Sequence, residues 1–131
     1  MDFMEIAINA ALKGGEILIS RFGSSNNVRF KDKINLVTDA DLLSERAVVD
    51  VIQKSFPDHQ IMGEEGLANG GESDHKWIID PLDGTTNYAH GYPVFSVSVA
   101  LEIKGDVVVG AVYNPILKEL FTAEKGKGAY L

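Results

Sequence analysis

The stretch Trp77-Ile78-Ile79-Asp80-Pro81-Leu82-Asp83-Gly84-Thr85-Thr86-Asn87 decides both the fold and the candidate chemistry of this chain. An apolar run typical of a buried strand leads to Asp80 and Asp83, which a proline turn separates, and then to a predicted helix start. Hard cations bind several carboxylate and carbonyl oxygens at one point, so we expect both aspartates and the Leu82 carbonyl to face one cation. The backbone N–H groups of residues 84–86 predict a phosphate seat at the helix start. A metal beside a phosphate seat indicates phosphoryl chemistry.

The same aspartates also have a purely structural interpretation. Asp83-Gly84 is common turn chemistry, and Asp80 is suited to the end of a strand. From the aspartate motif alone, the metal-site interpretation and the structural interpretation are nearly equally favoured. Glu64 and Glu65 favour the metal site, because they follow a predicted strand and a glycine where a merely solvated pair would be a coincidence. For either glutamate alone, a solvated surface acid remains the alternative.

Several other polar residues have two interpretations. Thr85 and Thr86 are suited to be N-caps of the predicted helix, but a hydroxyl there also suits holding a water against a metal. Asp41 is favoured at a helix N-terminus by the dipole, and a role as a base is suggested only by its spacing. Three histidines show no metal-ligand spacing and are interpreted as surface or loop residues: His59, His75 and His90.

The composition excludes several classes of protein. The chain has 131 residues, enough for one domain with a core, and it has no cysteine, which excludes disulfides and thiolate metal sites. Its net charge of −7 argues against a nucleic-acid partner, because phosphate contacts need clustered lysine and arginine. No apolar run reaches the length of a membrane span, and the acidic N-terminus lacks a signal peptide's basic flank. We therefore expect no membrane partner and cytoplasmic residence by default.

Two helices are predicted before the strands. The first covers 2–22, where Asp2 and Glu5 stand at capping-box spacing, and Gly23 ends it. Residues 24–38 are polar and basic and predict a loop or a loose hairpin. A second helix begins near residues 38–41 and ends at Pro57-Asp58. Its predicted apolar stripe consists of Leu42, Leu43, Val49, Ile52 and Phe56.

The rest of the chain reads as strands. A short strand over 60–63 precedes a loop over 66–75, and residues 94–103 alternate apolar with small or polar side chains. Lys104-Gly105-Asp106 predicts a hairpin turn, with further strands over 107–113 and 119–123. The predicted fold class is α+β, with two N-terminal helices packed on a mainly antiparallel β-sheet. The apolar ending Ala129-Tyr130-Leu131 favours a chain that is the N-terminal part of a longer protein.

Gly63-Glu64-Glu65, followed by the run from Trp77 to Tyr88, resembles the inositol monophosphatase family of magnesium-dependent, lithium-sensitive phosphatases. The resemblance covers essentially the whole chain, including 36–41 before the second helix and 126–129 near the end. It implies that residues 1–131 are the N-terminal metal-binding α+β domain, the first half of a layered α/β sugar-phosphatase fold. A C-terminal α/β domain that carries a further aspartate in a Trp-Asp motif would follow.

The resemblance also implies roles for the matching residues. The implied Mg²⁺ ligands are Glu64, Asp80, the Leu82 carbonyl and Asp83. The implied catalytic residues are Glu64, Thr85 and Asp41, of which Thr85, with Asp41, orients and activates the attacking water. Glu65 is implied to shape the site. The implied phosphate contacts are the backbones of Gly84 and Thr85. The implied mechanism is direct in-line attack of a metal-activated water on a phosphate monoester.

The implied function is hydrolysis of myo-inositol monophosphate to inositol and phosphate, so the expected partner is a small phosphorylated substrate, with a possible homodimer. Within the family, fructose-1,6-bisphosphatase, phosphoadenosine phosphate phosphatase and histidinol-phosphate phosphatase are alternatives, because the region that selects among them lies mostly beyond Leu131. A catalytically incomplete fragment that binds a metal is the alternative from another class.

Overall fold

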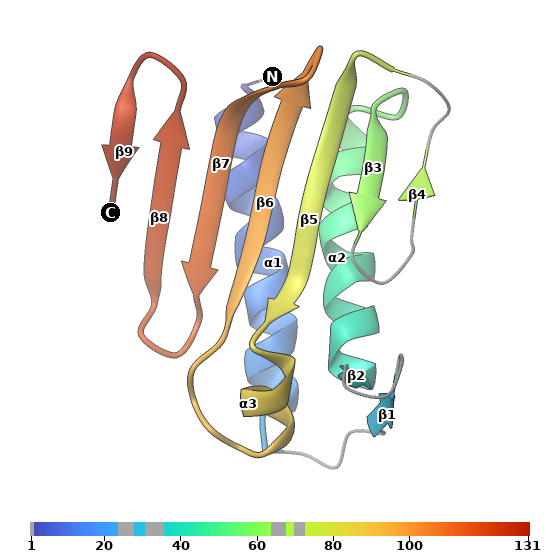
Figure 1. Ribbon diagram of the computed structural model, residues 1–131, viewed down its shortest axis with the longest axis vertical. Helices are drawn as coiled ribbons and strands as arrows, with labels where there is room; N and C mark the ends of the chain where they lie inside the picture. The colour runs from blue at the N-terminus through green and yellow to red at the C-terminus, as the bar shows by residue number, and fades with distance from the viewer. Residues whose placement is uncertain (1, 24–27, 31–35, 64–67, 70–72) are drawn as a thin grey trace.

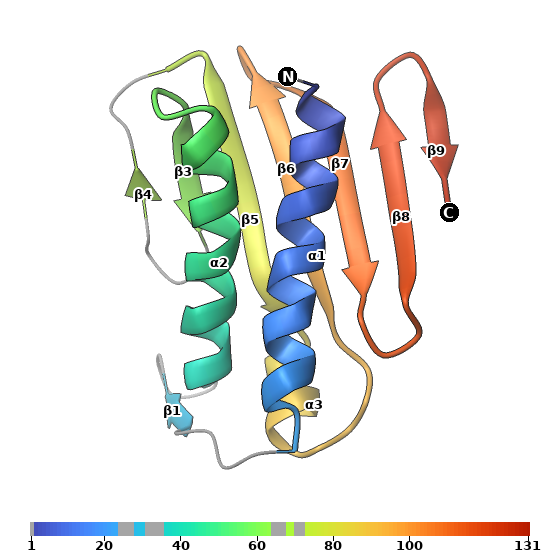
Figure 2. The same cartoon turned by 180° about the vertical axis from the view of Figure 1, so that it is seen from behind.

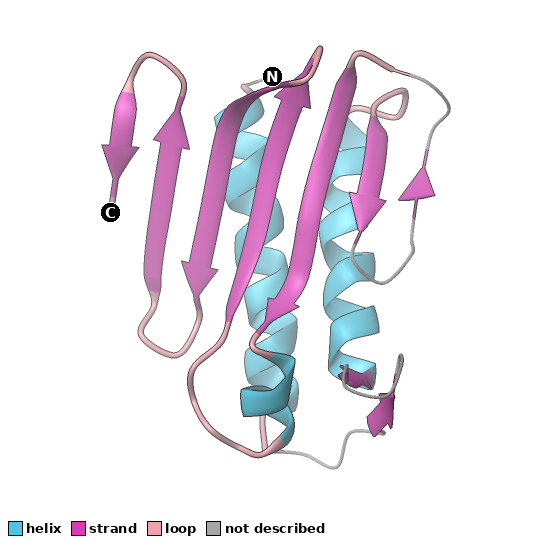
Figure 3. Ribbon diagram, viewed as in Figure 1, coloured by secondary structure: helices cyan, strands magenta, loops and turns pink. Residues whose placement is uncertain are grey.

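A computed structural model describes residues 2–23, 28–30, 36–63, 68–69 and 73–131 of the chain. Two long helices cover one face of a seven-stranded sheet whose strand order is β4-β3-β5-β6-β7-β8-β9, as Figures 1 and 2 show from opposite sides. The elements, in chain order, are α1 (Phe3–Arg21), β1 (Val28–Phe30), β2 (Leu36–Thr38), α2 (Asp39–Ser55), β3 (Gln60–Gly63), β4 (Ala68–Asn69), β5 (His75–Asp83), α3 (Thr85–Ala89), β6 (Ser96–Ile103), β7 (Asp106–Asn114), β8 (Glu119–Glu124) and β9 (Gly128–Tyr130). The predicted α+β class is confirmed (Figure 3).

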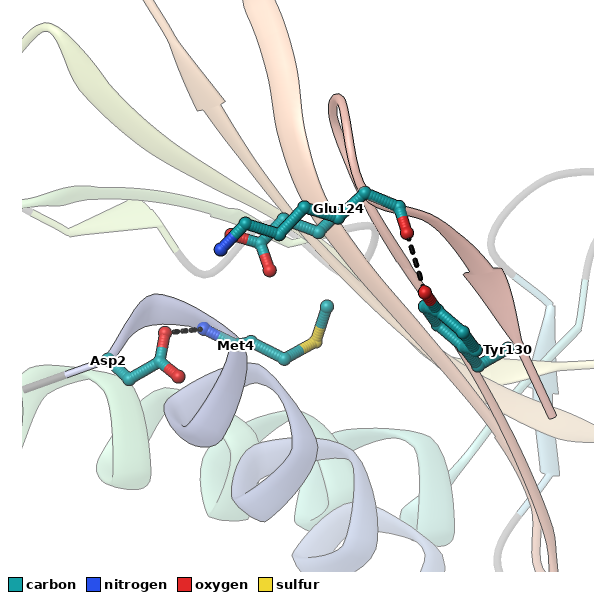
Figure 4. Close-up of polar contacts among 5 residues, drawn as sticks. Asp2, Met4, Glu124 and Tyr130 are labelled. Carbon is teal, nitrogen blue, oxygen red and sulfur yellow. Dashed lines mark hydrogen bonds and ion pairs between the residues drawn. The ribbon is translucent and has the colours of Figure 1, made fainter.

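The first helix lies where the sequence predicts it. Asp2 is its N-cap, and its carboxylate accepts a hydrogen bond of 3.1 Å from the Met4 backbone N–H (Figure 4). Gly23 has a φ of +80° just after the helix, a conformation that glycine adopts without steric cost. At its middle, α1 approaches α2 closely, because a Cβ on Gly14 would stand 2.9 Å from both Ser44 Oγ and a Val48 methyl carbon. Gly14 therefore sets the spacing of the two helices.

The second helix is confirmed, but its predicted apolar stripe is wrong at its N-terminal end. Leu43 is 39% exposed and Leu42 is only half-buried. The buried face consists instead of small and polar residues followed by two apolar ones: Ala40, Asp41, Ser44, Glu45, Val48 and Ile52. Because α2 packs closely against both α1 and β5, this end of the helix has room for small side chains rather than leucines.

The sheet is mainly antiparallel, as predicted. Of its strand pairs, β3 with β5 is the parallel one, with Gly63 opposite Ile79. The alternation predicted over 94–103 is confirmed, because Phe95, Val97, Val99 and Leu101 are all buried under the helices. The predicted hairpin turn between β6 and β7 is confirmed by positive φ angles at Lys104 (52°) and Gly105 (82°).

Two segments expected to be loops contain short strands. Within 24–38, β1 pairs antiparallel with β2, in agreement with a loose hairpin. Within 66–75, β4 pairs antiparallel with β3 at the edge of the large sheet. The other residues in the first of these segments, and 66–67 and 70–72 in the second, lie outside the described residues. No helix in the described part of the chain is both long and apolar enough to cross a membrane.

Candidate metal and phosphate site

The two motif aspartates lie at the C-terminal end of β5, which continues through Pro81 to Asp83 rather than ending in a turn. The predicted proline turn is therefore wrong. On β6, the partner of Asp80 is Ser98 and the partner of Asp83 is Ser96, so β5 carries one extra residue here as a bulge. Pro81 explains the bulge, because proline has no N–H to donate to the ladder.

The bulge is stabilised by short-range hydrogen bonds. The Leu82 backbone N–H donates to Asp80 Oδ1 at 3.3 Å, which orients that carboxylate over the bulge. The buried Ser44 hydroxyl donates to the Pro81 carbonyl at 2.8 Å. Asp80 is half-buried, whereas Asp83 is exposed. Asp80 is thus held by a hydrogen bond within the bulge, whereas Asp83 faces solvent.

Thr85 connects the bulge to α2. Its hydroxyl oxygen lies 3.1 Å from Asp41 Oδ2 and 3.1 Å from the Leu82 carbonyl oxygen. A hydroxyl has one proton to donate and two lone pairs, so the two acceptors share or exchange that proton. Asp41 is only 1% exposed, so its contact with Thr85 is made away from bulk water. The structure therefore brings together Thr85, Asp41 and Leu82, three residues that the sequence singled out separately.

Gly84 is the N-cap of α3, with a φ of +95°. A Cβ there would lie 2.8 Å from the Val94 carbonyl oxygen, so both the backbone angle and the space require glycine. The interpretation of Thr85 and Thr86 as N-caps is wrong, because the helix begins one residue after Gly84 and no side chain caps it. Helix geometry leaves the first N–H groups of α3 without intrahelical partners, and phosphate binding by Gly84 and Thr85 stays a prediction.

A hollow of about 250 Å³ opens beside Asp83. It is lined by Asp83, Gly84, Asn87, Val94, Phe95, Ser96 and Asn114. The Asn87 side-chain amide donates to the Val94 carbonyl at 3.0 Å, which ties α3 to the segment that leads into β6. The exposed aspartate and the glycine cap therefore face a space large enough for a small polar group.

The donor set suits a hard divalent cation, although the structure describes only part of it. Asp80 and Asp83 supply carboxylate oxygens, and the Leu82 carbonyl keeps a second lone pair beyond its contact with Thr85. Glu64 and Glu65 lie outside the described residues. Within the described ranges, no group of three or more His, Cys, Asp or Glu side chains forms a cluster able to hold a metal. The residues would thus supply oxygen ligands from β5, with Glu64 as the predicted further carboxylate.

Two buried polar residues behind the site were not predicted from the sequence. Ser44 and Glu45 are both 0% exposed on the face of α2 that also carries Asp41. Their signal was the spacing of Asp41 and Glu45 by four residues, which places both on one side of a helix. The predicted apolar stripe instead began with Leu42 and Leu43, which are less buried than Asp41, Ser44 and Glu45.

The interpretation of the histidines as surface or loop residues is confirmed for His59, which lies in the loop between α2 and β3, and is wrong for His75, which lies on β5. His59 and His75 are half-buried and stack on each other, with ring centroids 4.4 Å apart. His59 Nδ1 accepts a hydrogen bond of 3.0 Å from the indole N–H of Trp77, so that nitrogen carries no proton. Burial lowers the pKa of His59 below its usual value, His75 lowers it further, and Asp58 raises it. His90 is exposed, as expected.

Comparison with known proteins identifies the family to which this chain belongs. The chain matches the model of the inositol monophosphatase family over residues 2–131. It is 47% identical over 129 residues to "Nus factor SuhB" of Pasteurella multocida, an alignment that covers 96% of this chain and 48% of that protein. It is 44% identical over 131 residues to "Fructose-1,6-bisphosphatase/inositol-1-monophosphatase" of Aquifex aeolicus, covering 98% of this chain and 50% of that protein.

The structural comparison agrees with the sequence comparison. The solved IMPase of Thermotoga maritima superposes with a TM-score of 0.91 at 42% identity, over 99% of this chain and 51% of that one. This similarity confirms the predicted fold class. The chain spans about half the length of the curated relatives it matches. It belongs to the inositol monophosphatase family.

Proposed function

We propose that this chain carries the metal-binding and water-activating half of a magnesium-dependent phosphomonoesterase that hydrolyses myo-inositol monophosphate to inositol and phosphate. The observation that carries the proposal is the position of the Thr85 hydroxyl, 3.1 Å from both Asp41 and the Leu82 carbonyl. It lies next to the bulge that bears Asp80 and Asp83. A hydroxyl held between a buried carboxylate and a candidate metal ligand is suited to orient a water molecule.

The roles of the residues follow from their hydrogen bonds. Bound Mg²⁺ would be held by Asp80, Asp83, the Leu82 carbonyl and Glu64, and it would lower the pKa of water and offset phosphate charge. In the proposed arrangement, the Thr85 hydroxyl donates its hydrogen bond to Asp41. A Thr85 lone pair is then free to accept a hydrogen bond from the attacking water, which points a water lone pair at phosphorus. Glu64 is the proposed acceptor of the water's proton.

The phosphate would bind at the start of α3. Gly84 allows the backbone to approach closely, and the N–H groups of Gly84 and Thr85 are proposed to donate to the phosphate oxygens. The chain's net charge of −7 would repel a phosphate monoester, so the cation is also needed to make approach favourable. These considerations favour a small phosphorylated substrate and disfavour nucleic acid and membrane partners. We also propose cytoplasmic residence, the default for a chain without cysteine. A homodimer is proposed on the family resemblance.

The substrate is proposed from the relatives. The Thermotoga maritima structure is named an IMPase, and the Aquifex aeolicus protein is named for both fructose-1,6-bisphosphatase and inositol-1-monophosphatase. The second name supports fructose 1,6-bisphosphate as a second candidate substrate. Both are phosphate monoesters of a polyhydroxylated ring, so the same metal and water chemistry would serve either.

Phosphate release from inositol 1-phosphate and from fructose 1,6-bisphosphate tests the proposal. It should be measured with and without Mg²⁺, for this chain and for the chain fused to the second half of the Aquifex aeolicus relative. We expect Mg²⁺-dependent release by the fusion, suppressed by Li⁺, with inositol 1-phosphate preferred. Release of phosphate from only the bisphosphate would show that fructose 1,6-bisphosphate, and not inositol 1-phosphate, is the substrate. Absence of Mg²⁺-dependent release by the fusion from both would overturn the enzyme proposal and favour a metal-binding fragment.

A further inference from the structure

The buried polar side chains in the part of the chain that the structure describes all lie on α2. Asp41, Ser44 and Glu45 are 1%, 0% and 0% exposed. Burying such groups is costly unless they make specific contacts, so three within one short stretch of helix require an explanation. Asp41 contacts Thr85 and belongs to the proposed water-activating group. Ser44 and Glu45 have no part in that chemistry, and each contacts a different segment of the site.

Glu45 contacts the end of β3. A Cβ built on Gly63 would lie 2.6 Å from the carboxyl carbon of Glu45 and 3.3 Å from its Oε2. The Glu45 carboxyl group therefore fills the space that a side chain at position 63 would need. Gly63 is paired with Ile79, the residue before Asp80, and it directly precedes Glu64 in the chain. This contact lies where β3 and β5 both reach the candidate metal site.

Ser44 contacts the bulge. Its hydroxyl lies 2.8 Å from the Pro81 carbonyl oxygen and 3.4 Å from the Gly14 carbonyl oxygen of α1. The shorter contact is the stronger one, and it joins α2 to the residue between Asp80 and Leu82. Two neighbouring residues of one helix thus contact the end of β3 and the bulge of β5 that bears Asp80 and Asp83.

We infer that Ser44 and Glu45 are positioning residues, which fix the end of β3 and the Asp80–Asp83 bulge at the separation that cation binding requires. This inference rests on the proposed metal-binding role of Asp80 and Asp83. A helix is a rigid support, and groups behind metal ligands set ligand geometry without touching the ion. Gly63 is part of the arrangement, because any larger residue would displace the Glu45 carboxyl group.

Amide hydrogen exchange on the chain without metal tests the positioning directly. Glu45→Gln should accelerate exchange of residues 60–63, and Ser44→Ala should accelerate exchange of residues 80–85, each by about 10-fold. Exchange in β7 should not change, because local openings are independent of distant strands. Asp50→Asn is the matched control, since Asp50 lies on the same helix, is exposed and pairs with Lys54. Equal acceleration in all strands, or none in the named segments, would overturn the inference.

Mn²⁺ titration of the same variants separates a positioning role from a merely structural one. Glu45→Gln should weaken Mn²⁺ binding about 10-fold, while Asp50→Asn leaves it unchanged. Unchanged affinity in Glu45→Gln would overturn the inference. If the unaltered chain does not bind Mn²⁺, the proposed metal role fails, and with it the purpose assigned to these two residues, whatever the exchange rates show.

A compensating pair provides the sharpest check. Gly63→Ala should weaken Mn²⁺ binding, because the new methyl group meets the Glu45 carboxyl group. Glu45→Asp shortens that side chain by one methylene and makes room for the methyl group. The double variant should therefore bind Mn²⁺ more tightly than Gly63→Ala alone. Additive losses would show that the two residues act independently and would overturn the direct contact as the cause.

Discussion

The two ends of β5 differ in how they use their side chains. At the C-terminal end, Asp80 and Asp83 extend from a bulge beside a hollow, and hydrogen bonds from Leu82 and Ser44 stabilise that bulge. At the N-terminal end, Trp77 is fully buried and donates to His59, which stacks between the rings of Phe56 and His75. The C-terminal end of β5 thus presents oxygen atoms toward a hollow, whereas the N-terminal end packs its rings into the core.

This difference predicts two kinds of response to substitution. Changes at the C-terminal end should alter metal dependence and turnover with little effect on stability, because Asp83 is exposed and the Thr85 hydroxyl is only part-buried. Changes at the N-terminal end should alter stability, and its pH dependence, without altering metal binding. Substitutions at each end test whether the two ends are separable in this way.

The largest expected effect is that of Asp83→Asn, assayed in the fusion described above. It should abolish Mg²⁺-dependent turnover, because an amide is a weaker ligand than a carboxylate for a hard cation. The free energy of unfolding should stay within about 0.5 kcal/mol of the unaltered value, since the side chain is exposed. Turnover assays and urea denaturation check both parts. Unchanged turnover with unchanged Mg²⁺ dependence would disprove the ligand assignment.

Next in size is Thr85→Ala, which should lower kcat by about 10²- to 10⁴-fold in the fusion. The reason is that a water would lose the hydroxyl that orients it, while Asp80 and Asp83 remain. Thr85→Ser is the matched control, because it keeps the oxygen that lies 3.1 Å from Asp41 Oδ2. Equally low activity in the two variants would show that the methyl group, rather than the hydroxyl, is important at this position, and unaltered activity in both would disprove the role of Thr85.

At the other end of β5, Trp77→Phe should lower the free energy of unfolding by about 1–3 kcal/mol. Phenylalanine is smaller and has no N–H, so it leaves space in the core and removes the hydrogen bond to His59. Mn²⁺ affinity should not change. Denaturation and titration of the same sample check this, and a large loss of affinity would show that the two ends of the strand are coupled.

The sequence made the carboxylate end of β5 predictable but not the aromatic end. Asp80 and Asp83 belong to one short motif, so their proximity follows from local spacing. The ring cluster joins three segments that are far apart in the sequence and meet only after the helices pack on the sheet: Phe3, Phe56 with His59, and His75 with Trp77. No local pattern contains that information. The elements themselves were predictable because their hydrophobic periods are local.

The burial of Glu45, behind the candidate site, also could not be predicted from a local sequence pattern. Its side chain is fully buried, although acidic residues in helices are usually solvated. What buries it is Gly63, eighteen residues later in the chain, which leaves space for a carboxyl group where any other residue would have a side chain. Pro81 is similar, because the bulge around it exists only in the pairing of β5 with β6, where Asp80 lies opposite Ser98 and Asp83 lies opposite Ser96. The buried Glu45 and the bulge at Pro81 therefore each depend on two segments that meet in the fold, and the sequence of one segment alone does not predict them.

The smallest expected effect is a pH dependence of stability that originates at His59. Its pKa lies below the usual value of 6.5, because burial and His75 disfavour the charged ring. The unfolded chain therefore binds more protons than the folded chain as pH falls below about 6.5, and stability must decrease there. Above that pH the ring is neutral in both states, and the full stability is present.

Thermal unfolding between about pH 7.5 and about pH 5.5 measures this effect. His59→Gln is the reference variant, because it keeps a carbonyl acceptor for the Trp77 N–H and cannot titrate. The decrease in melting temperature should be larger for the unaltered chain than for His59→Gln. Replacing the two neighbouring side chains should then act in opposite directions. His75→Gln makes the decrease smaller and Asp58→Asn makes it larger, because His75 lowers the pKa of His59 and Asp58 raises it. Identical pH profiles for the unaltered chain and His59→Gln would show that the stability of this end of β5 depends on packing alone.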